Sequence, residues 1–378
     1  MSYTKLFTFI LSIFVVGMVE LMIAGILTLV SDDLHISEAL AGQLVTIYAF
    51  TFALSGPLLV KLTEKYNPKW VLLITMGVFI IGNAINAAGP TFAVIVVGRI
   101  IASAAAALIV VKLLALTVVL SRPEVRGKML GLVYIGFSGA NVFGVPIGTK
   151  IGELFGWRAT FWMIVAVSFI AAVLLMFQLP SRIAPVSPAT AGKVKSKLLY
   201  PQEAAKYISI TFLILAANSA VFTYISPIMI NGGYHLSEVS IALFIAGIGS
   251  MTGTSLGGAM TDKLGSRKWL LLSIAIFILS VLLLNVTLPV YLLLLLIILT
   301  WNLSEWGTNP AIQMGIINQV EGDTSQIMAW NMSALNAGIG FGALIGGVLV
   351  EYFAPSFSTY IAAALAIICL LIATTIKR

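Results

Sequence analysis

Long apolar runs alternate with short polar segments along the whole chain. A run of about 20 apolar residues is long enough to cross a bilayer as a helix, whereas the strands of a membrane β-barrel would be short and alternating. The pattern predicts twelve spans, at residues 6–30, 38–60, 70–88, 92–120, 129–152, 158–179, 206–230, 238–260, 269–287, 289–318, 325–352 and 356–376. We therefore expect an all-α membrane protein with twelve transmembrane helices.

The two halves of the chain repeat each other. A His-x-Ser-Glu sequence opens the second span at His35 and the eighth at His235, and a Lys-Trp-x-Leu-Leu sequence opens the third at Lys69 and the ninth at Lys268. Both matches have an offset of about 200 residues, and we interpret both histidines as structural. Two six-helix sets in the same order form a parallel repeat, which places a substrate site near the midplane between the halves. The predicted domains are 1–180, a cytoplasmic linker at 181–205, and 206–378.

Composition and charge support membrane insertion and set an orientation. The chain is 60% hydrophobic and 9% charged, with a net charge of +7. With both termini in the cytoplasm, cytoplasmic segments would hold seventeen of the basic residues, among them Lys128, Arg182, Lys193, Lys195 and Arg378, and outer segments only Lys150 and Arg158. This bias satisfies the positive-inside rule, so the cations set topology and do not indicate a nucleic-acid partner. The first span is interpreted as an uncleaved helix and not as a signal peptide.

Four ionisable residues fall inside predicted spans: Glu20, Arg99, Lys112 and Glu305. Charge at bilayer depth is costly and marks proton relays or substrate contacts. Glu20 is our first candidate for a proton site, with Arg99 as its partner; the alternative is a fixed structural ion pair. Glu305 would bind an amine, act as a second proton site, or pair with another group. Lys112 would neutralise an acid, contact an anionic substrate, or snorkel towards the cytoplasm.

Polar and aromatic side chains in the seventh, tenth and eleventh spans suit a planar heterocycle; the alternative is hydrogen bonding between helices. Together with Lys112, the candidates for the substrate cavity are Asn218, Tyr224, Trp301, Asn302, Trp306, Asn309, Asn331 and Asn336. Glycines also recur every four residues in the fifth, eighth and eleventh spans, as either ordinary packing faces or a sliding contact between halves. No metal-ligand cluster, phosphate-binding loop or nucleophile–base arrangement is seen, so we expect no metal, no cofactor and no enzyme.

Two motifs resemble those of the major facilitator superfamily. The loop after the eighth span holds Gly258, Asp262, Lys263, Gly265 and Arg267 at the spacing of that family's cytoplasmic loop motif; its charges would form a latch, or serve topology alone. Its N-half equivalent is degraded, with Glu64 and Asn67 where aspartate and glycine are expected. In the fifth span, Gly144, Pro146 and Gly148 resemble the family's antiporter motif. The gating candidates are Gly258, Asp262, Lys263, Gly265, Arg267, Gly144, Pro146 and Gly148.

The stretch from Val19 through Ala41–Leu44 to Ser55–Leu58, and Asn331–Gly340 in the eleventh span, resemble the twelve-helix drug:proton antiporter branch of that superfamily. The resemblance covers nearly the whole chain and is greatest, within that branch, to purine and nucleoside efflux pumps and arabinose-type efflux permeases. It implies the major facilitator fold and places Arg99 near the first helix. We expect a monomeric proton antiporter in a bacterial cytoplasmic membrane that exports a small organic solute, purine-like or drug-like, with the proton gradient as its energy source. The alternatives are a multidrug pump, a sugar efflux permease, and uniport or symport. A membrane sensor would need a soluble domain, and a membrane enzyme a catalytic constellation.

Overall fold

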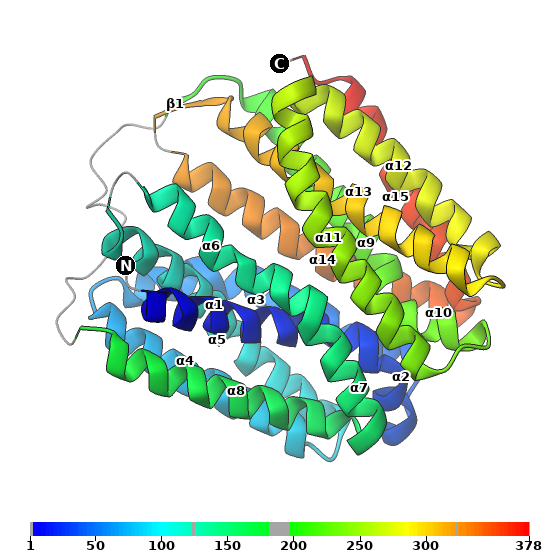
Figure 1. The fold of residues 1–378 in the computed structure, drawn as a ribbon, viewed down its shortest axis with the longest axis horizontal. Helices are drawn as coiled ribbons and strands as arrows, with labels where there is room; N and C mark the ends of the chain where they lie inside the picture. The colour runs from blue at the N-terminus through cyan, green and yellow to red at the C-terminus, as the bar shows by residue number, and fades with distance from the viewer. Residues whose placement is uncertain (1–2, 123–124, 181–196, 323, 378) are drawn as a thin grey trace. The chain divides into compact units, whose positions relative to one another are not determined.

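The computed structural model describes residues 3–122, 125–180, 197–322 and 324–377, which are almost entirely helical (Figure 1). Among them are twelve helices long and apolar enough to cross a membrane, so the prediction of an all-α protein with twelve spans is confirmed. Arg182, Lys193, Lys195, Arg378 and most of the predicted linker lie outside the described residues, as does the side chain of Lys128.

The helices follow the predicted spans closely. The first six spans are formed by α1 (Tyr3–Leu21) with α2 (Ile23–Leu34), α3 (Glu38–Thr63), α4 (Pro68–Ala88), α5 (Phe92–Leu120), α6 (Arg126–Gly139) with a π-helix (Ala140–Gly144) and α7 (Val145–Phe155), and α8 (Trp157–Gln178). The last six are α9 (Pro201–Phe222) with α10 (Ile225–Asn231), α11 (Leu236–Leu264), α12 (Ser266–Thr287), α13 (Tyr291–Ile317), α14 (Ser325–Tyr352), and a short 3-10 helix (Pro355–Phe357) with α15 (Ser358–Thr374). Two antiparallel strands, β1 (Lys197–Leu198) and β2 (Val320–Glu321), pair with each other.

Three spans that we predicted as continuous are interrupted. The first span breaks at Met22 and the seventh at Thr223–Tyr224, an offset of about 200 residues, so the breaks occupy equivalent places in the repeat. Pro227 explains the second break, because a proline cannot donate to the carbonyl four residues earlier, here that of Thr223. In the fifth span, Pro146 likewise leaves the Val142 carbonyl without its helical donor, and a π-helical turn precedes it. No proline accounts for the break at Met22.

The chain forms two compact units. The first contains residues Met1–Leu34 and Ile47–Lys193, and the second contains His35–Thr46 and Val194–Arg378. In the first unit α1 packs along α6, and α4 packs on α5 and α8; in the second α11 packs along α13, and α9 along α14. The first turns of α3 thus cluster with the second unit, although they belong to the second span.

The glycine faces pack inside these units. Side chains added at Gly144 and Gly148 would meet Met18 and Met22 of the first span. In α11, Gly249, Gly253 and Gly257 face the backbone of α13, and in α14, Gly338, Gly342 and Gly346 face the backbone of α9. The arrangement is that of ordinary close helix packing, and our alternative of a sliding contact between halves is wrong for these faces.

Gly257 and Gly258 provide a direct test of this packing. A Cβ atom at Gly257 would lie 2.8 Å from the Gly307 Cα atom of α13, whereas one at Gly258 would meet nothing within 4 Å. Overpacking of this kind costs about 1–3 kcal/mol. We expect Gly257→Ala to lower the melting temperature in detergent measurably and Gly258→Ala to leave it within a degree or so of the parent. Equal melting temperatures for the two variants would contradict the packing described.

Candidate functional site

Glu20 lies at the break in the first span. It is half-buried, in the last turn of α1, two residues before Met22. Around the break the Met22 amide donates to Met18 at 2.9 Å, and the Gly25 amide donates to Met22 at 3.0 Å. Broken helices at bilayer depth are a common place for ion and substrate sites in transporters. The interruption therefore puts a carboxyl group where the backbone itself departs from the helix.

Arg99 of α5 contacts the same turn. Its side chain is fully buried, and its Nη1 atom donates to the Val19 carbonyl at 2.8 Å. Its Cζ atom lies 4.3 Å from the centre of the Tyr48 ring, a cation–π contact. Arg99 thus lies against the first helix, as the resemblance implied, close enough to Glu20 to interact with it electrostatically. The guanidinium thus joins the fourth span to the first and second within the first unit.

Tyr48 is the residue of this cluster that sequence reasoning missed. Its ring lies under Arg99, and its carbonyl accepts a hydrogen bond from Ser103 Oγ at 2.5 Å. A tyrosine within an apolar span gives no signal of a cation partner 51 residues later, because that contact depends on how the helices pack.

The antiporter-like motif packs against the segment that carries Glu20. A Cβ atom at Gly148 would lie 2.8 Å from the Met22 Sδ atom, and one at Gly144 would collide with Met18. Pro146 lies between these two glycines, just after the π-helical turn Ala140–Gly144. The break in the first span and the irregular turn in the fifth therefore fit against each other, which gives Gly144, Pro146 and Gly148 a direct steric link to the Glu20 turn.

Lys112 is placed differently from Arg99. It is buried, but its Nζ atom donates to the Thr63 carbonyl at 3.2 Å, at the C-terminal end of α3. A cation at a helix C-terminus meets the negative end of the helix dipole. The lysine thus reaches the end of a neighbouring helix, while the three roles predicted for it, including snorkelling towards the cytoplasm, stay predictions.

The second unit contains Glu305, in the middle of α13. It is 1% exposed, and its Oε2 atom has no hydrogen-bond partner among the described residues. Trp301 lies one turn away on the same helix face, and its ring meets Phe222 of α9 at 6.3 Å between centroids. Asn302 and Asn309 lie on the same side of α13; the Asn302 amide donates to Ile298 within its own helix. Trp306 and Asn309 are half-buried.

The other cavity candidates make contacts between or within helices. Asn331 Oδ1 accepts from Thr211 at 2.6 Å, which joins α14 to α9. Asn336 donates to Met332 in its own helix. Tyr224, at the break in the seventh span, is buried and donates to the Ala343 carbonyl at 2.9 Å. For Asn331 this is the interhelical hydrogen bonding that we kept as an alternative.

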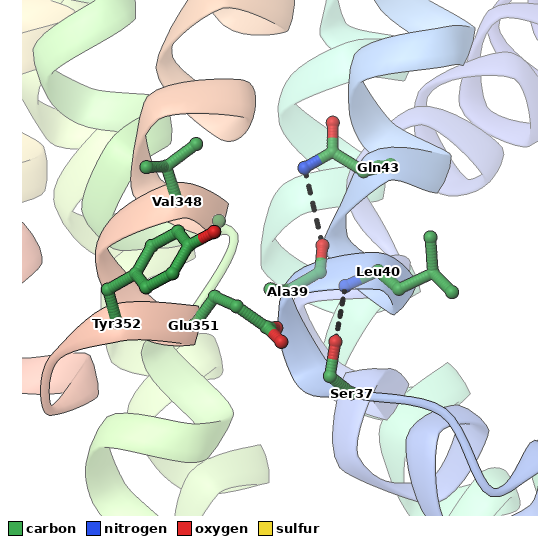
Figure 2. A pocket seen from close by; sticks show the side chains of 8 residues that line it. Ser37, Ala39, Leu40, Gln43, Val348, Glu351 and Tyr352 are labelled. Atoms are coloured by element: carbon green, nitrogen blue, oxygen red, sulfur yellow. Dashed lines mark hydrogen bonds between the residues drawn. The ribbon is translucent and has the colours of Figure 1, made fainter.

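A cavity of about 370 Å³ lies in the second unit (Figure 2). Ser37, the first two turns of α3 and the end of α14 form it, and its lining includes Gln43, Gly347 and Glu351. A side chain at Gly347 would meet both Gln43 Nε2 and the Tyr224 hydroxyl, each at 2.6 Å. The residues that line this cavity include neither Glu305 nor any of our cavity candidates, so the cavity is separate from the site predicted from the sequence.

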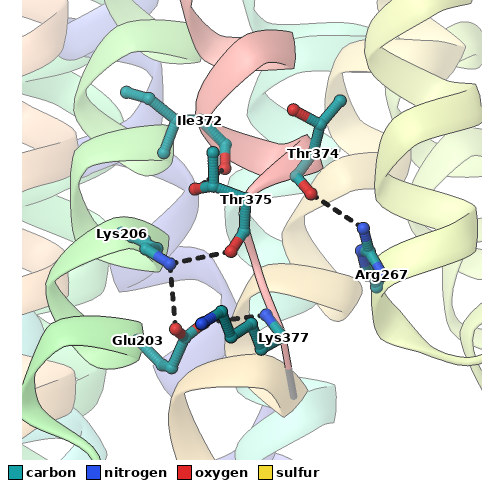
Figure 3. A network of polar contacts seen from close by, with 7 residues as sticks. All are labelled: Glu203, Lys206, Arg267, Ile372, Thr374, Thr375 and Lys377. Atoms are coloured by element: carbon teal, nitrogen blue, oxygen red, sulfur yellow. Dashed lines mark hydrogen bonds and ion pairs between the residues drawn. The ribbon is translucent and has the colours of Figure 1, made fainter.

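In the loop motif that follows the eighth span, Arg267 contacts the end of the last span. Figure 3 shows Arg267 donating to the Thr374 carbonyl at the end of α15, at 2.7 Å. In the same network Lys206 pairs with Glu203 at 2.9 Å and donates to Thr375, and the Lys377 amide donates to Glu203. Asp262 and Lys263 are exposed, and Asp262 forms no ion pair within the described ranges. In this structure the arginine of the motif therefore fastens the end of the last span.

The two repeat loops differ for a local reason. Gly265 has a φ of +84°, a conformation that glycine adopts without strain. Asn67, at the matching place in the first unit, has a φ of −60° and instead caps α4 by accepting from the Lys69 amide at 3.0 Å. The Lys69 side chain is buried and donates to the Leu179 carbonyl at 2.7 Å. The degraded motif is thus a helix cap with a different geometry.

Comparison with known proteins agrees with this architecture. The profile described as Major Facilitator Superfamily matches residues 9–323 and, separately, 208–377. The chain is 30% identical to the uncharacterized MFS-type transporter YbcL of Bacillus subtilis (strain 168), over 95% of this chain and 92% of that protein. It is 26% identical to a probable sugar efflux transporter of Helicobacter pylori (strain G27), over 97% and 93% of the two chains.

Solved structures with the same fold include a point mutant of the peptide transporter POT in complex with alafosfalin. It matches with a TM-score of 0.76 and 15% identity, over 98% of this chain and 93% of that one. At this identity the likeness shows the fold alone, and it confirms the predicted fold class. The family profile and the near-complete coverage of its relatives show that the chain belongs to the Major Facilitator Superfamily of membrane transporters.

Proposed function

We propose that this transporter exports a small organic solute in exchange for protons, with Glu20 as the group that takes up and releases the proton. The observation that carries the proposal is the position of Glu20 at the helix break, beside the buried Arg99. Burial favours the protonated form of a carboxyl group, whereas a neighbouring cation favours the ionised form, so the balance between the two forms can shift as the surroundings open to water. Solute binding and protonation would then alternate as the protein exposes its site to each side of the membrane.

The antiporter-like motif supports exchange. Its glycines allow the fifth span to press on Met18 and Met22, on either side of Glu20. A change in the irregular turn at Ala140–Gly144 would therefore reach the proton site by direct contact. Following the positive-inside bias, we propose a multi-pass protein of a bacterial cytoplasmic membrane with both termini inside, acting as a monomer without a cofactor.

Transport of sugars is the second candidate, because relatives named probable sugar efflux transporters align over nearly the whole chain. The test is uptake into proteoliposomes under an imposed pH gradient, with labelled purine bases, nucleosides, a sugar and a cationic dye as solutes. We expect gradient-driven movement of one solute class. Movement of the dye and several unrelated solutes would favour a multidrug pump, and movement of the sugar alone a sugar exporter. Solute movement at a rate that does not depend on the pH gradient would contradict proton exchange.

A further inference from the structure

Glu305 is a buried carboxyl group without a counter-charge in its helix. It lies 14 residues from Tyr291 and 12 from Ile317, the two ends of α13, or about 18–21 Å from each end at the helical rise. Its Oε2 atom has no partner among the described residues. An ionised carboxylate in such surroundings is very costly unless a cation accompanies it, so Glu305 needs either a proton or a positively charged ligand.

The helices packed against α13 do not supply that cation. These are α9, α11, α12 and α14, and the charged residues within them all lie near a helix end: Glu203, Lys206, Glu238, Asp262, Lys263, Arg267, Lys268 and Glu351. The tyrosine that faces α13 from α9, Tyr207, meets it at Gly315, nearly three turns away from Glu305. No basic side chain on these helices is therefore near the middle of the span.

Two contacts fix the register between α9 and α13 at this level. Phe222 meets Trp301, and Tyr207 meets Gly315, so residue numbers fall along α9 as they rise along α13. Asn218 lies four residues before Phe222 on α9, and Glu305 lies four residues after Trp301 on α13. Because the helices are antiparallel, Asn218 and Glu305 lie at the same level along the helix pair. Asn218 is also on the same face of α9 as Phe222 and Tyr207, because all three share the helical period.

Three acceptor atoms near this height lack donors, and the Trp301 Nε1 atom one turn away is a buried donor without an acceptor among the described residues. Asn218 Oδ1, Asn302 Oδ1 and Glu305 Oε2 are all buried and have no hydrogen-bond partner in the described part of the chain. Buried acceptors are costly when left unpaired. An ammonium group carries three N–H donors and no acceptor, so it supplies what these three oxygens lack, together with the charge that Glu305 needs.

The aromatic pair beside them suits the rest of such a ligand. Trp301 is fully buried one turn from Glu305, with Phe222 against its ring. Indole faces attract cations, and aromatic rings bind the apolar part of an amphipathic amine. From this combination we infer that Glu305, Asn218, Asn302 and Trp301 form a binding site for an organic amine in its protonated form. A proton on Glu305 and the ammonium group of the ligand would exclude each other.

This inference rests on the proposed function in that it names the class of solute exported, but its test does not depend on Glu20. The probe is phenethylamine, a primary ammonium with one ring, and its binding to the purified protein is measured by calorimetry. The neutral analogue 2-phenylethanol and the quaternary analogue phenethyltrimethylammonium are compared with it. We expect both to bind at least about tenfold more weakly, since the first lacks the charge and the second lacks the N–H donors. Acidification should weaken phenethylamine binding by up to about tenfold per pH unit, because protons compete for Glu305.

Matched variants distinguish a loss of the amine site from a general loss of folding. Glu305→Gln should lose at least about tenfold in phenethylamine affinity and most of the pH dependence, whereas Glu321→Gln, an exposed acid of the same unit, should bind as the parent does. Trp301→Leu should weaken binding and keep the pH dependence. Unchanged affinity in Glu305→Gln, equal binding of the neutral alcohol, or no amine binding by the parent would overturn the inference. Gradient-driven transport that still requires Glu20 would in that case leave the proposed function intact.

Discussion

Glu20→Gln should abolish solute export driven by a pH gradient and leave downhill solute movement in place. Glutamine has the size of a protonated glutamate but cannot release or accept the proton. We expect gradient-driven transport to fall to the level of protein-free vesicles, while solute still moves down its own concentration gradient. The measurement is transport in proteoliposomes with and without an imposed pH gradient.

Glu153→Gln is the matched control for that experiment. Glu153 is in the same unit and pairs with Lys150 at 2.7 Å in the last turns of α7, away from the described cluster. We expect it to transport like the parent protein. Full gradient-driven transport by Glu20→Gln would show that the proton is carried elsewhere, whatever the control does.

Arg99→Lys should be almost as damaging, although it keeps the charge. Lysine lacks the planar guanidinium that lies on Tyr48 and the geometry that reaches the Val19 carbonyl. A lost charge-assisted hydrogen bond costs about 1.5–3 kcal/mol, so we expect a transport rate lower by about tenfold or more and a lower melting temperature in detergent.

Lys112→Arg is the comparison for Arg99→Lys, because Lys112 contacts a helix end and not the Glu20 turn. We expect it to retain most of its transport. If Arg99→Lys transported and melted like the parent, the charge alone would be sufficient, and the stacking on Tyr48 would have no role in positioning Glu20.

Much of this fold could be predicted from the lengths of the apolar runs in the sequence alone. The predicted span 92–120 coincides with α5 (Phe92–Leu120), since few polar residues interrupt it and Thr91 and Ser121 flank it. The breaks could be predicted only in part. Pro227 and Pro146 signal the irregular turns in the seventh and fifth spans, but Met22 lies in an apolar run with no proline, and its break depends on packing.

The candidate site shows the same division. Charge at bilayer depth was sufficient to select Glu20, Arg99 and Glu305, because such residues are rare in apolar spans. The same criterion could not predict which groups each of these residues contacts. Arg99 contacts Val19 and Tyr48, whereas Lys112, 13 residues further along the same helix, contacts the end of α3. Those partners come from other helices, so they follow from tertiary packing and carry no local signal.

The proposed proton exchange is tested most directly by asking whether a solute gradient drives proton movement. Purified protein in vesicles with a trapped pH-sensitive dye would receive a gradient of its transported solute and no initial pH gradient. Coupling is reciprocal, so solute flowing out should drive protons in, with acidification that disappears in Glu20→Gln. Solute movement without any proton movement, in vesicles that hold an imposed pH gradient, would contradict proton-coupled export.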